Sequence, residues 1–231
     1  MCSVSWNFRE GGYELVCNRD EKWARAPSLD CKFEAHHPVP GFCARDAQAN
    51  GTWLFTNEAG LTLALFNAYP GASPVSGKRT RGQIPLLAGE ADSFEMLVNL
   101  LQSKCYADYA PFDLLLLDDS NARRFGWDGV KFSENTIGGL PFLTSSSVDS
   151  QRVIAARKQR FEQIRHLPLI DLLSDTKAGK PEEAIYVTRE DGGTVSQTIV
   201  QVNQDEIKFS VQRRDDTQHS ISAPRKSLMK V

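Results

Sequence analysis

The sequence predicts an α+β fold built on antiparallel β-sheets. Three observations support this class. Short segments that alternate between apolar and polar residues recur along the chain, and this period is typical of β-strands. Glycine-containing turns join neighbouring segments, as in β-hairpins. Only two stretches have helical periodicity, and they are grouped between the strands, an order typical of α+β proteins.

The first predicted element is a β-hairpin. Residues 2–8 alternate between apolar and polar side chains, residues 9–12 contain two glycines, and a second strand begins at Tyr13. A second hairpin is expected over residues 53–66, around a turn that ends in Gly60.

The later elements follow from periodicity and capping signals. Asp92 and Glu95 have the spacing of a capping box at a helix start. The polar composition of residues 215–231 predicts a flexible tail. In order, we expect irregular structure over 22–50, a helix over 92–105, a strand over 112–117, a helix over 149–166 and strands over 184–188, 195–202 and 207–213.

The composition is that of an ordinary globular protein. The chain has 231 residues, 27 basic and 29 acidic side chains, a net charge of −2 and 41% hydrophobic residues. This length suits a single domain over residues 1–231. The small net charge gives no general attraction to nucleic acid. The apolar runs are shorter than the ~18 residues of a membrane span, and the N-terminus lacks signal-peptide features, so we expect a cytoplasmic protein without a membrane span.

The register of the first hairpin brings a cysteine next to charged residues. With a two-residue loop at Gly11-Gly12, Cys2 lies opposite Glu21; with a four-residue loop, Cys2 lies opposite Arg19. Directly opposed Cβ atoms are about 5 Å apart. In both registers the thiol of Cys2 therefore lies near the segment 18–21, which contains a cation and two carboxylates.

Cys2 can carry chemistry if Met1 is removed. The five cysteines are an odd number, which argues against a disulfide framework. Removal of Met1 would give Cys2 a free α-amine with a pKa of about 7.7–8.0, suitable for a base. Arg19 would lower the pKa of the thiol, and Asp20 could hold the protonated amine. The alternative is an incidental cysteine beside a solvated turn.

These residues resemble the NRDE family, a transport and Golgi organisation protein 2-like family. The resemblance rests on Cys2 and on the string Asn18-Arg19-Asp20-Glu21. Further family-like segments are Arg25-Ala26-Pro27, Ala44-Arg45-Asp46, Gly51-Thr52-Trp53-Leu54, Asn67 and Arg81-Gly82. The same region is similar to the cysteine-type N-terminal nucleophile hydrolases, which include bile salt hydrolases.

The resemblance implies a fold, an activity and a site. The fold is an αββα sandwich of two antiparallel sheets. The activity is that of a hydrolase or acyltransferase acting on a small-molecule amide or thioester after Met1 removal. In that site Cys2 is the nucleophile, Arg19 and Asp20 are its charged pair, and Asn67 supplies the oxyanion hole. The candidate substrate-binding residues are Asn18, Glu21, Trp53 and Ser146.

Two departures from the family pattern leave a second function open. Ser146 stands where the family has asparagine, and Val195 stands where it has arginine. The alternative is therefore a non-catalytic carrier or chaperone that binds haem, acyl-CoA or lipid in the same pocket. The resemblance also implies a part in haem or lipid handling.

The remaining chemistry-bearing residues give weaker signals. Cys31, His36, His37 and Cys43 lack the spacing of a standard zinc site, so we expect no metal and no cofactor. A haem role for His36 or His37 stays as an alternative. The basic residues at 78–81 are interpreted as a solvated loop, with phosphate or carboxylate binding as the alternative.

Overall fold

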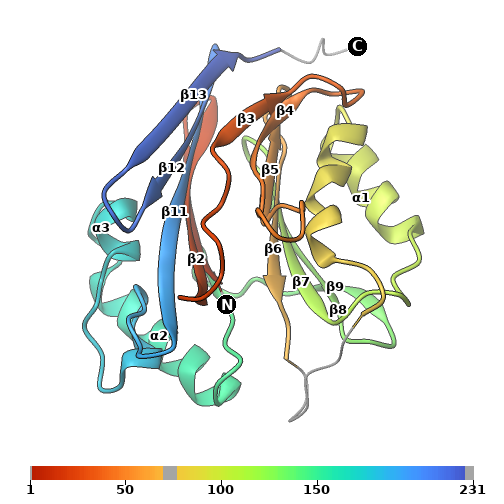
Figure 1. Ribbon diagram of the computed structural model, residues 1–231. Helices are drawn as coiled ribbons and strands as arrows, with labels where there is room; N and C mark the ends of the chain where they lie inside the picture. The colour runs from red at the N-terminus through yellow and green to blue at the C-terminus, as the bar shows by residue number, and fades with distance from the viewer. Residues whose placement is uncertain (1, 70–76, 227–231) are drawn as a thin grey trace.

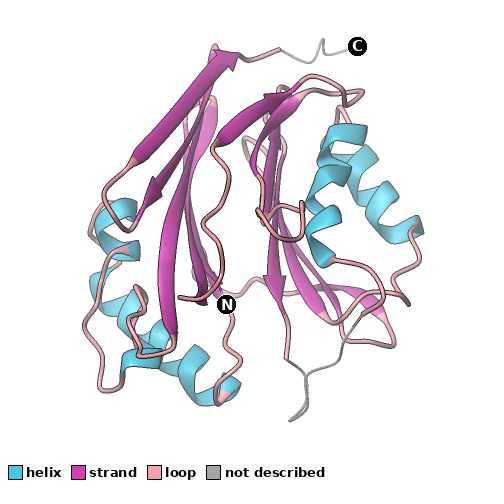
Figure 2. Cartoon of the chain, in the orientation of Figure 1, coloured by secondary structure: helices cyan, strands magenta, loops and turns pink. Residues whose placement is uncertain are grey.

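The protein is a sandwich of two antiparallel β-sheets with helices on both outer faces (Figure 1, Figure 2). This computed structural model describes residues 2–69 and 77–226. One sheet has six strands in the order β10-β1-β2-β11-β12-β13, and the other has seven in the order β3-β4-β5-β6-β7-β8-β9. The predicted α+β class and the αββα arrangement are confirmed.

The bounds of the elements are as follows. The strands are β1 (Cys2–Arg9), β2 (Gly12–Lys22), β3 (Cys31–Glu34), β4 (Gly41–Ala44), β5 (Leu54–Asn57), β6 (Thr62–Asn67), β7 (Phe112–Leu117), β8 (Ala122–Trp127), β9 (Phe132–Asn135), β10 (Phe142–Thr144), β11 (Gly192–Val202), β12 (Glu206–Arg213) and β13 (Gln218–Pro224). The α-helices are α1 (Phe94–Ser103), α2 (Ser150–Ile164) and α3 (Leu169–Leu173), and the 3₁₀ helices are η1 (Arg81–Gln83), η2 (Pro85–Glu90) and η3 (Pro181–Glu183). Within the described ranges, no helix combines the length and apolar character needed to cross a membrane.

Both faces of β1 are buried over its first five residues. Val4 and Trp6 belong to the core between the sheets. Ser3 and Ser5 face the outer helices instead, and both are fully buried. Their hydroxyls are hydrogen-bonded, since Ser5 Oγ donates to the Pro141 carbonyl at 2.8 Å and Ser3 Oγ shares a bond with a threonine of β10. The alternation in β1 therefore separates an apolar core from a hydrogen-bonded polar layer.

Helices cover the outer face of each sheet. Helices α2 and α3 pack on the six-stranded sheet through a cluster that includes Val16 and Phe161. Helix α1 and η2 pack on the seven-stranded sheet, where Leu97 and Leu101 are fully buried. The predicted apolar stripe of the first helix is thus confirmed for these positions, whereas Cys105 is exposed beyond the helix end.

The first hairpin adopts one of the two predicted registers. Cys2 pairs with Arg19, and the pairing continues to Arg9 opposite Gly12. The loop consists of Glu10 and Gly11, and Gly11 has a φ of +71°, a conformation that favours glycine. Cys2 lies opposite Arg19, as predicted for the four-residue loop, although the observed loop has only two residues.

The structure differs from the predictions in four further segments. The irregular region 22–50 contains β3 and β4. Helix α3 and strands β8, β9 and β10 were not expected. The predicted strand at 184–188 is wrong: within this segment only Thr188 forms a bridge, to Gly193, and two backbone groups bond to side chains instead, since Asn18 Nδ2 donates to the Ile185 carbonyl and Val187 N donates to Thr194 Oγ1.

The C-terminal segment forms a strand where a tail was predicted. Strand β13 pairs with β12 over seven residues. Ile221 and Ala223 pack against the core, while the alternate positions are exposed. The polar composition of this segment is that of an edge strand with one solvent-exposed face. The last part of the predicted tail, 227–231, lies outside the described residues.

Candidate functional site

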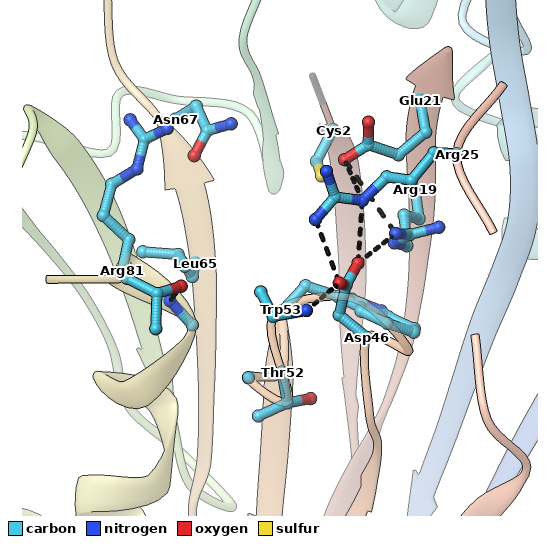
Figure 3. Close-up of a pocket in the computed structure, with 14 residues that line it drawn as sticks. Cys2, Arg19, Glu21, Arg25, Asp46, Thr52, Trp53, Leu65, Asn67 and Arg81 are labelled. Carbon is cyan, nitrogen blue, oxygen red and sulfur yellow. Dashed lines mark hydrogen bonds and ion pairs between the residues drawn. The ribbon is translucent and has the colours of Figure 1, made fainter. Parts of the chain in front are cut away.

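A pocket of about 200 Å³ lies at the start of β1, lined by residues of both sheets (Figure 3). We call it the Cys2 pocket. Five of the eight predicted site residues line it: Cys2, Arg19, Glu21, Trp53 and Asn67. The first three come from β1 and β2, and Asn67 comes from the end of β6 in the opposite sheet. The two sheets thus bring residues far apart in sequence to one cavity.

Cys2 is the first residue of β1 and is 9% exposed. Burial raises the pKa of its thiol, the charges of Asp20 and Glu21 raise it further, and Arg19 lowers it. The backbone nitrogen of Cys2 donates to Ser145 Oγ at 3.3 Å. The Cys2 carbonyl accepts from the Ser145 backbone nitrogen at 3.0 Å. Met1 lies outside the described residues, so its removal stays a prediction.

Arg19 is held by a carboxylate that the sequence analysis did not select. Its guanidinium donates to Asp46 Oδ2 at 2.6 Å and lies 4.9 Å above the ring of Trp53. Arg25 donates to both oxygens of Asp46 at 2.9 Å. Burial raises the pKa of Asp46, but hydrogen bonds from Arg25 and Ala49 and the nearby guanidinium charges lower it to about 2. Asp46 is therefore ionised and orients both arginines.

Glu21 completes the charged wall of the Cys2 pocket. One of its carboxylate oxygens lies 3.9 Å from Arg19 and 3.7 Å from Arg25. Asp46, Arg19, Arg25 and Glu21 form a network rather than a single pair (Figure 3). Asp46 and Arg25 do fall within family-like sequence segments, and that was the available signal for them.

The opposite wall of the pocket carries Asn67 and Arg81. Figure 3 shows both residues across the cavity from Cys2. Arg81 donates to the Pro111 carbonyl at 2.7 Å, and burial lowers its pKa. The interpretation of residues 78–81 as a solvated loop is therefore wrong for Arg81, although the side chain of Lys78 is 87% exposed.

Asp20 lies beyond the pocket lining, among polar groups of the helix side. Its Oδ1 accepts a hydrogen bond from Thr194 Oγ1 at 2.7 Å, and its Oδ2 lies 3.9 Å from the guanidinium of Arg157. Burial raises the pKa of Asp20, and the charge of Arg157 opposes this. Arg157 is fully buried and also donates to Thr144 Oγ1 at 2.8 Å. A basic residue on the apolar side of helix α2 was the signal for this partner.

Two predicted substrate-binding residues lie away from the Cys2 pocket. Asn18 is fully buried and donates to the carbonyls of Leu173 and Ile185 at 2.7 and 3.0 Å. It faces the helix side of the sheet and ties that layer to β2. Ser146 bonds to the backbone of Val148 within its own turn. Ser145, one position earlier, is the serine that contacts Cys2.

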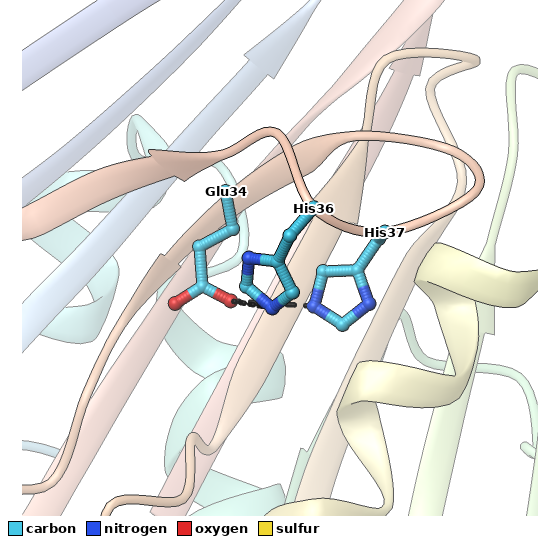
Figure 4. A group of neighbouring side chains, drawn as sticks. All are labelled: Glu34, His36 and His37. Carbon is cyan, nitrogen blue, oxygen red and sulfur yellow. Dashed lines mark hydrogen bonds and ion pairs between the residues drawn. The ribbon is translucent and has the colours of Figure 1, made fainter.

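The four residues considered for metal or haem do not form one cluster. The Cys31 sulfur lies 2.9 Å from His219 Nδ1. His36 and His37 instead gather around Glu34 (Figure 4). Neither histidine is in the lining of the Cys2 pocket. A haem role for His36 or His37 stays a prediction.

The fold defines a class, that of proteins with the N-terminal nucleophile hydrolase fold. Two variants of the conjugated bile acid hydrolase from Clostridium perfringens match with TM-scores of 0.54 and 0.63, each at 10% identity, covering 99% of this chain and 97% of theirs. The Caenorhabditis elegans ortholog of N-acylethanolamine-hydrolyzing acid amidase matches with a TM-score of 0.53 at 11% identity, covering 86% of this chain and 92% of its own. At these identities the similarity concerns the fold.

The family follows from the sequence itself. A profile of the Transport and Golgi organisation 2 family matches residues 1–215, and the chain belongs to that family. No curated protein sequence matches it.

Proposed function

We propose that this protein is a cysteine N-terminal nucleophile hydrolase or acyltransferase that acts on an amide or thioester once Met1 is removed. The observation that carries the proposal is the placement of Cys2 in a pocket, paired with Arg19 and faced by Asn67 from the other sheet. The names of the structural neighbours, a bile acid hydrolase and an amidase, favour an amide among these substrates.

The proposed reaction begins with a thiol that is protonated at rest. Burial raises the pKa of Cys2, so the free α-amine of the same residue would take the proton as the sulfur attacks the carbonyl carbon. The resulting oxyanion would accept a hydrogen bond from the Asn67 amide. The ammonium would then protonate the leaving nitrogen as the C–N bond breaks. The thioester that remains is cleaved by water or by an acceptor amine.

Ser145 and Asp20 would hold the α-amine of Cys2 in place. Ser145 Oγ lies 3.3 Å from the Cys2 nitrogen, which is the atom that becomes the α-amine. The carboxylate of Asp20 is close enough to influence the Cys2 thiol and would stabilise the ammonium form. Ser145 and Asp20 are therefore proposed as positioning residues for the base.

Two adjoining pockets suggest where the two parts of a substrate would bind. The Cys2 pocket contains three arginines and two carboxylates, Arg19, Arg25 and Arg81 with Glu21 and Asp46. This excess of one positive charge suits a polar or anionic group. A second pocket of about 330 Å³ shares Asn67 with the first and has Phe112, Trp127 and Ile154 in its lining. Its lining also includes Asp113, Arg124 and Asp128, so an acyl group there would meet both apolar and charged side chains.

The proposal is tested with Cys2→Ala and Cys2→Ser variants. Intact mass should show a wild-type chain without Met1, and iodoacetamide should label Cys2 at a pH near the pKa of the amine. A panel of N-acyl amides and acyl thioesters should give turnover with the wild type and none with Cys2→Ala. Cys105→Ser is the control, because Cys105 is exposed and is not part of the pocket lining. Retained Met1, or equal turnover by Cys2→Ala, would overturn the proposal.

A non-catalytic carrier of an acyl ligand is the second candidate. It is favoured by one observation: Arg19 is already paired with Asp46 at 2.6 Å, so less of its charge is free to activate the thiol. A carrier would bind acyl-CoA, lipid or haem with the same affinity in the wild type and in Cys2→Ala. Saturable binding without turnover in both proteins would favour this candidate over the enzyme.

A further inference from the structure

A second cluster of chemically active side chains lies at the turn between β3 and β4. Glu34 ends β3, and His36 and His37 follow in the turn (Figure 4). Their ligand atoms lie within 4.8 Å of one another, and this is the one such group found in the described parts of the chain. None of the three residues lines the Cys2 pocket.

The spacing of these atoms matches that around a small metal ion. His37 Nε2 lies 3.3 Å and His36 Nε2 lies 3.9 Å from Glu34 Oε2. In a tetrahedral zinc site with bonds of about 2.1 Å, neighbouring ligand atoms are about 3.4 Å apart. Only small side-chain movements would therefore bring all three atoms to one ion.

The surroundings of His37 fix its orientation. Its side chain is 10% exposed and packs edge-on against Phe55 with ring centroids 5.1 Å apart. The backbone of Gly89 lies so close that a Cβ there would meet the ring at 2.7 Å. The second ring nitrogen, Nδ1, lies 3.7 Å from a carboxylate oxygen of Glu90. Metal-binding histidines commonly have such a carboxylate next to the nitrogen that does not bind the metal.

Glu34 is oriented in a similar way. Arg45 Nε donates to Glu34 Oε1 at 2.7 Å, and Arg45 Nη2 contacts Oε2. The ion would replace the hydrogen bond between His37 Nε2 and Oε2, which makes that lone pair of Oε2 available to it. His36 is 69% exposed and leaves a path from solvent to the cluster.

We infer that Glu34, His36 and His37 bind one divalent transition-metal ion, with zinc the best match to two imidazoles and one carboxylate. The fourth position faces solvent and would be taken by water. Arg45 and Glu90 act as positioning residues that hold the first two ligands. The site is separate from the proposed acyl chemistry, and its presence does not depend on that function.

The test uses zinc itself on protein stripped by chelation and dialysed. Because a free N-terminal cysteine can also chelate zinc, the measurement is made in the Cys2→Ala background. Isothermal titration should give one equivalent of zinc, and zinc should raise the melting temperature. His36→Ala should abolish stoichiometric binding, and because His36 is exposed this variant should fold. Glu90→Gln should weaken binding by about 10- to 100-fold, as expected for the loss of a group that orients a ligand.

His166→Ala is the matched control, since His166 is also an exposed histidine but lies outside the cluster. Unchanged binding by His166→Ala, together with loss in His36→Ala, supports the site. Absence of zinc binding by the parent protein, or equal binding by His36→Ala, overturns it. In that case the cluster is a hydrogen-bonded ion-pair network between Arg45, Glu34 and His37.

Discussion

Asp46 fixes the position of the Arg19 guanidinium. It accepts hydrogen bonds from Arg19 and Arg25 and receives further bonds from the backbone nitrogens of Gln48 and Ala49. A single carboxylate thus orders the loop after β4 and fixes two cations at the pocket. Any chemistry at Cys2 works with an Arg19 that is already held in place.

The first prediction concerns the pH dependence of this network. The pKa of Asp46 is lowered in the folded protein from 3.8 to about 2. Its contribution to stability is therefore complete above the unfolded pKa and is lost as the pH falls from about 4 to about 2. Asp46→Asn should lower the free energy of unfolding by about 2 kcal/mol at neutral pH. It should also lose this part of the acid sensitivity in urea titrations.

Asp92→Asn serves as the control for that measurement, because Asp92 is exposed. It should unfold like the wild type across the same pH range. An Asp46→Asn protein as stable as the wild type would contradict the role assigned to Asp46.

The neighbouring serines give a second prediction with a built-in comparison. Ser145→Ala removes the hydroxyl next to the Cys2 nitrogen and should slow iodoacetamide labelling of Cys2 about tenfold, equivalent to about 1.4 kcal/mol. Ser146→Ala removes a bond to the Val148 backbone and should cost about 1 kcal/mol of stability with unchanged labelling. Equal slowing in both variants would argue against a specific role for Ser145.

At the scale of single residues, the sequence predicted the contacts that local structure determines. Cys2 and Arg19 meet because one hairpin turn sets their register. Asp46 follows β4 in one sheet and Arg19 lies on β2 in the other, so they meet only when the two sheets pack, and no local pattern encodes that contact. The contact of Ser145 rather than Ser146 with Cys2 has the same origin, since the pairing of β10 with β1 decides which serine reaches Cys2.

At the scale of elements, β13 shows how an edge strand resembles a tail in sequence. The strand closes one edge of the six-stranded sheet. Its polar positions face solvent, while its apolar positions cover the core at the end of the sandwich. Strands β3 and β4 are equally hard to predict, because each has four residues and the segment around them contains several prolines.

The third prediction tests whether β13 belongs to the fold. Ile221→Asp would place a charge against the core and should lower the free energy of unfolding by about 2 kcal/mol. Ser222→Asp, one residue later on the exposed face, should change it by less than about 0.5 kcal/mol. Urea denaturation of the two variants checks this. A flexible tail would leave both unchanged.

At the scale of the whole molecule, Arg225 connects turns of both sheets. Its guanidinium donates to the carbonyls of Gly11 at 3.2 Å, Asn203 at 3.0 Å and Ala59 at 3.2 Å. It also donates to a carboxylate oxygen of Asp119 at 2.8 Å. These groups lie in four different turns, two from each sheet. Arg225 therefore links the two sheets at the end where the β1–β2 hairpin turns, whereas Cys2 lies at the other end of β1.

The fourth prediction follows from that link. Arg225→Ala should lower the free energy of unfolding by about 2 to 3 kcal/mol, because it removes several hydrogen bonds from one charged group. Labelling of Cys2 should not change. Arg165→Ala, at an arginine whose side chain is 63% exposed, should stay within about 0.5 kcal/mol of the wild type. Similar stability of the two variants would show that the link contributes little.

The class of the molecule was predictable because it depends on repeated features. Alternating segments and glycine turns recur often enough that errors in single elements, such as 184–188, do not change the class. The arrangement of the two sheets came from the family resemblance, since strand order depends on long-range contacts such as β2 with β11.

Trp53 gives the pocket an optical reporter. Its indole lines the Cys2 pocket, lies 4.9 Å below the Arg19 guanidinium and donates to Thr198 Oγ1 at 2.9 Å. The chain has four tryptophans, so the difference between the emission of the wild type and that of Trp53→Phe isolates this one ring. A molecule entering the pocket would displace water from the indole and change its fluorescence. Ligands can thus be screened in solution before any substrate is known.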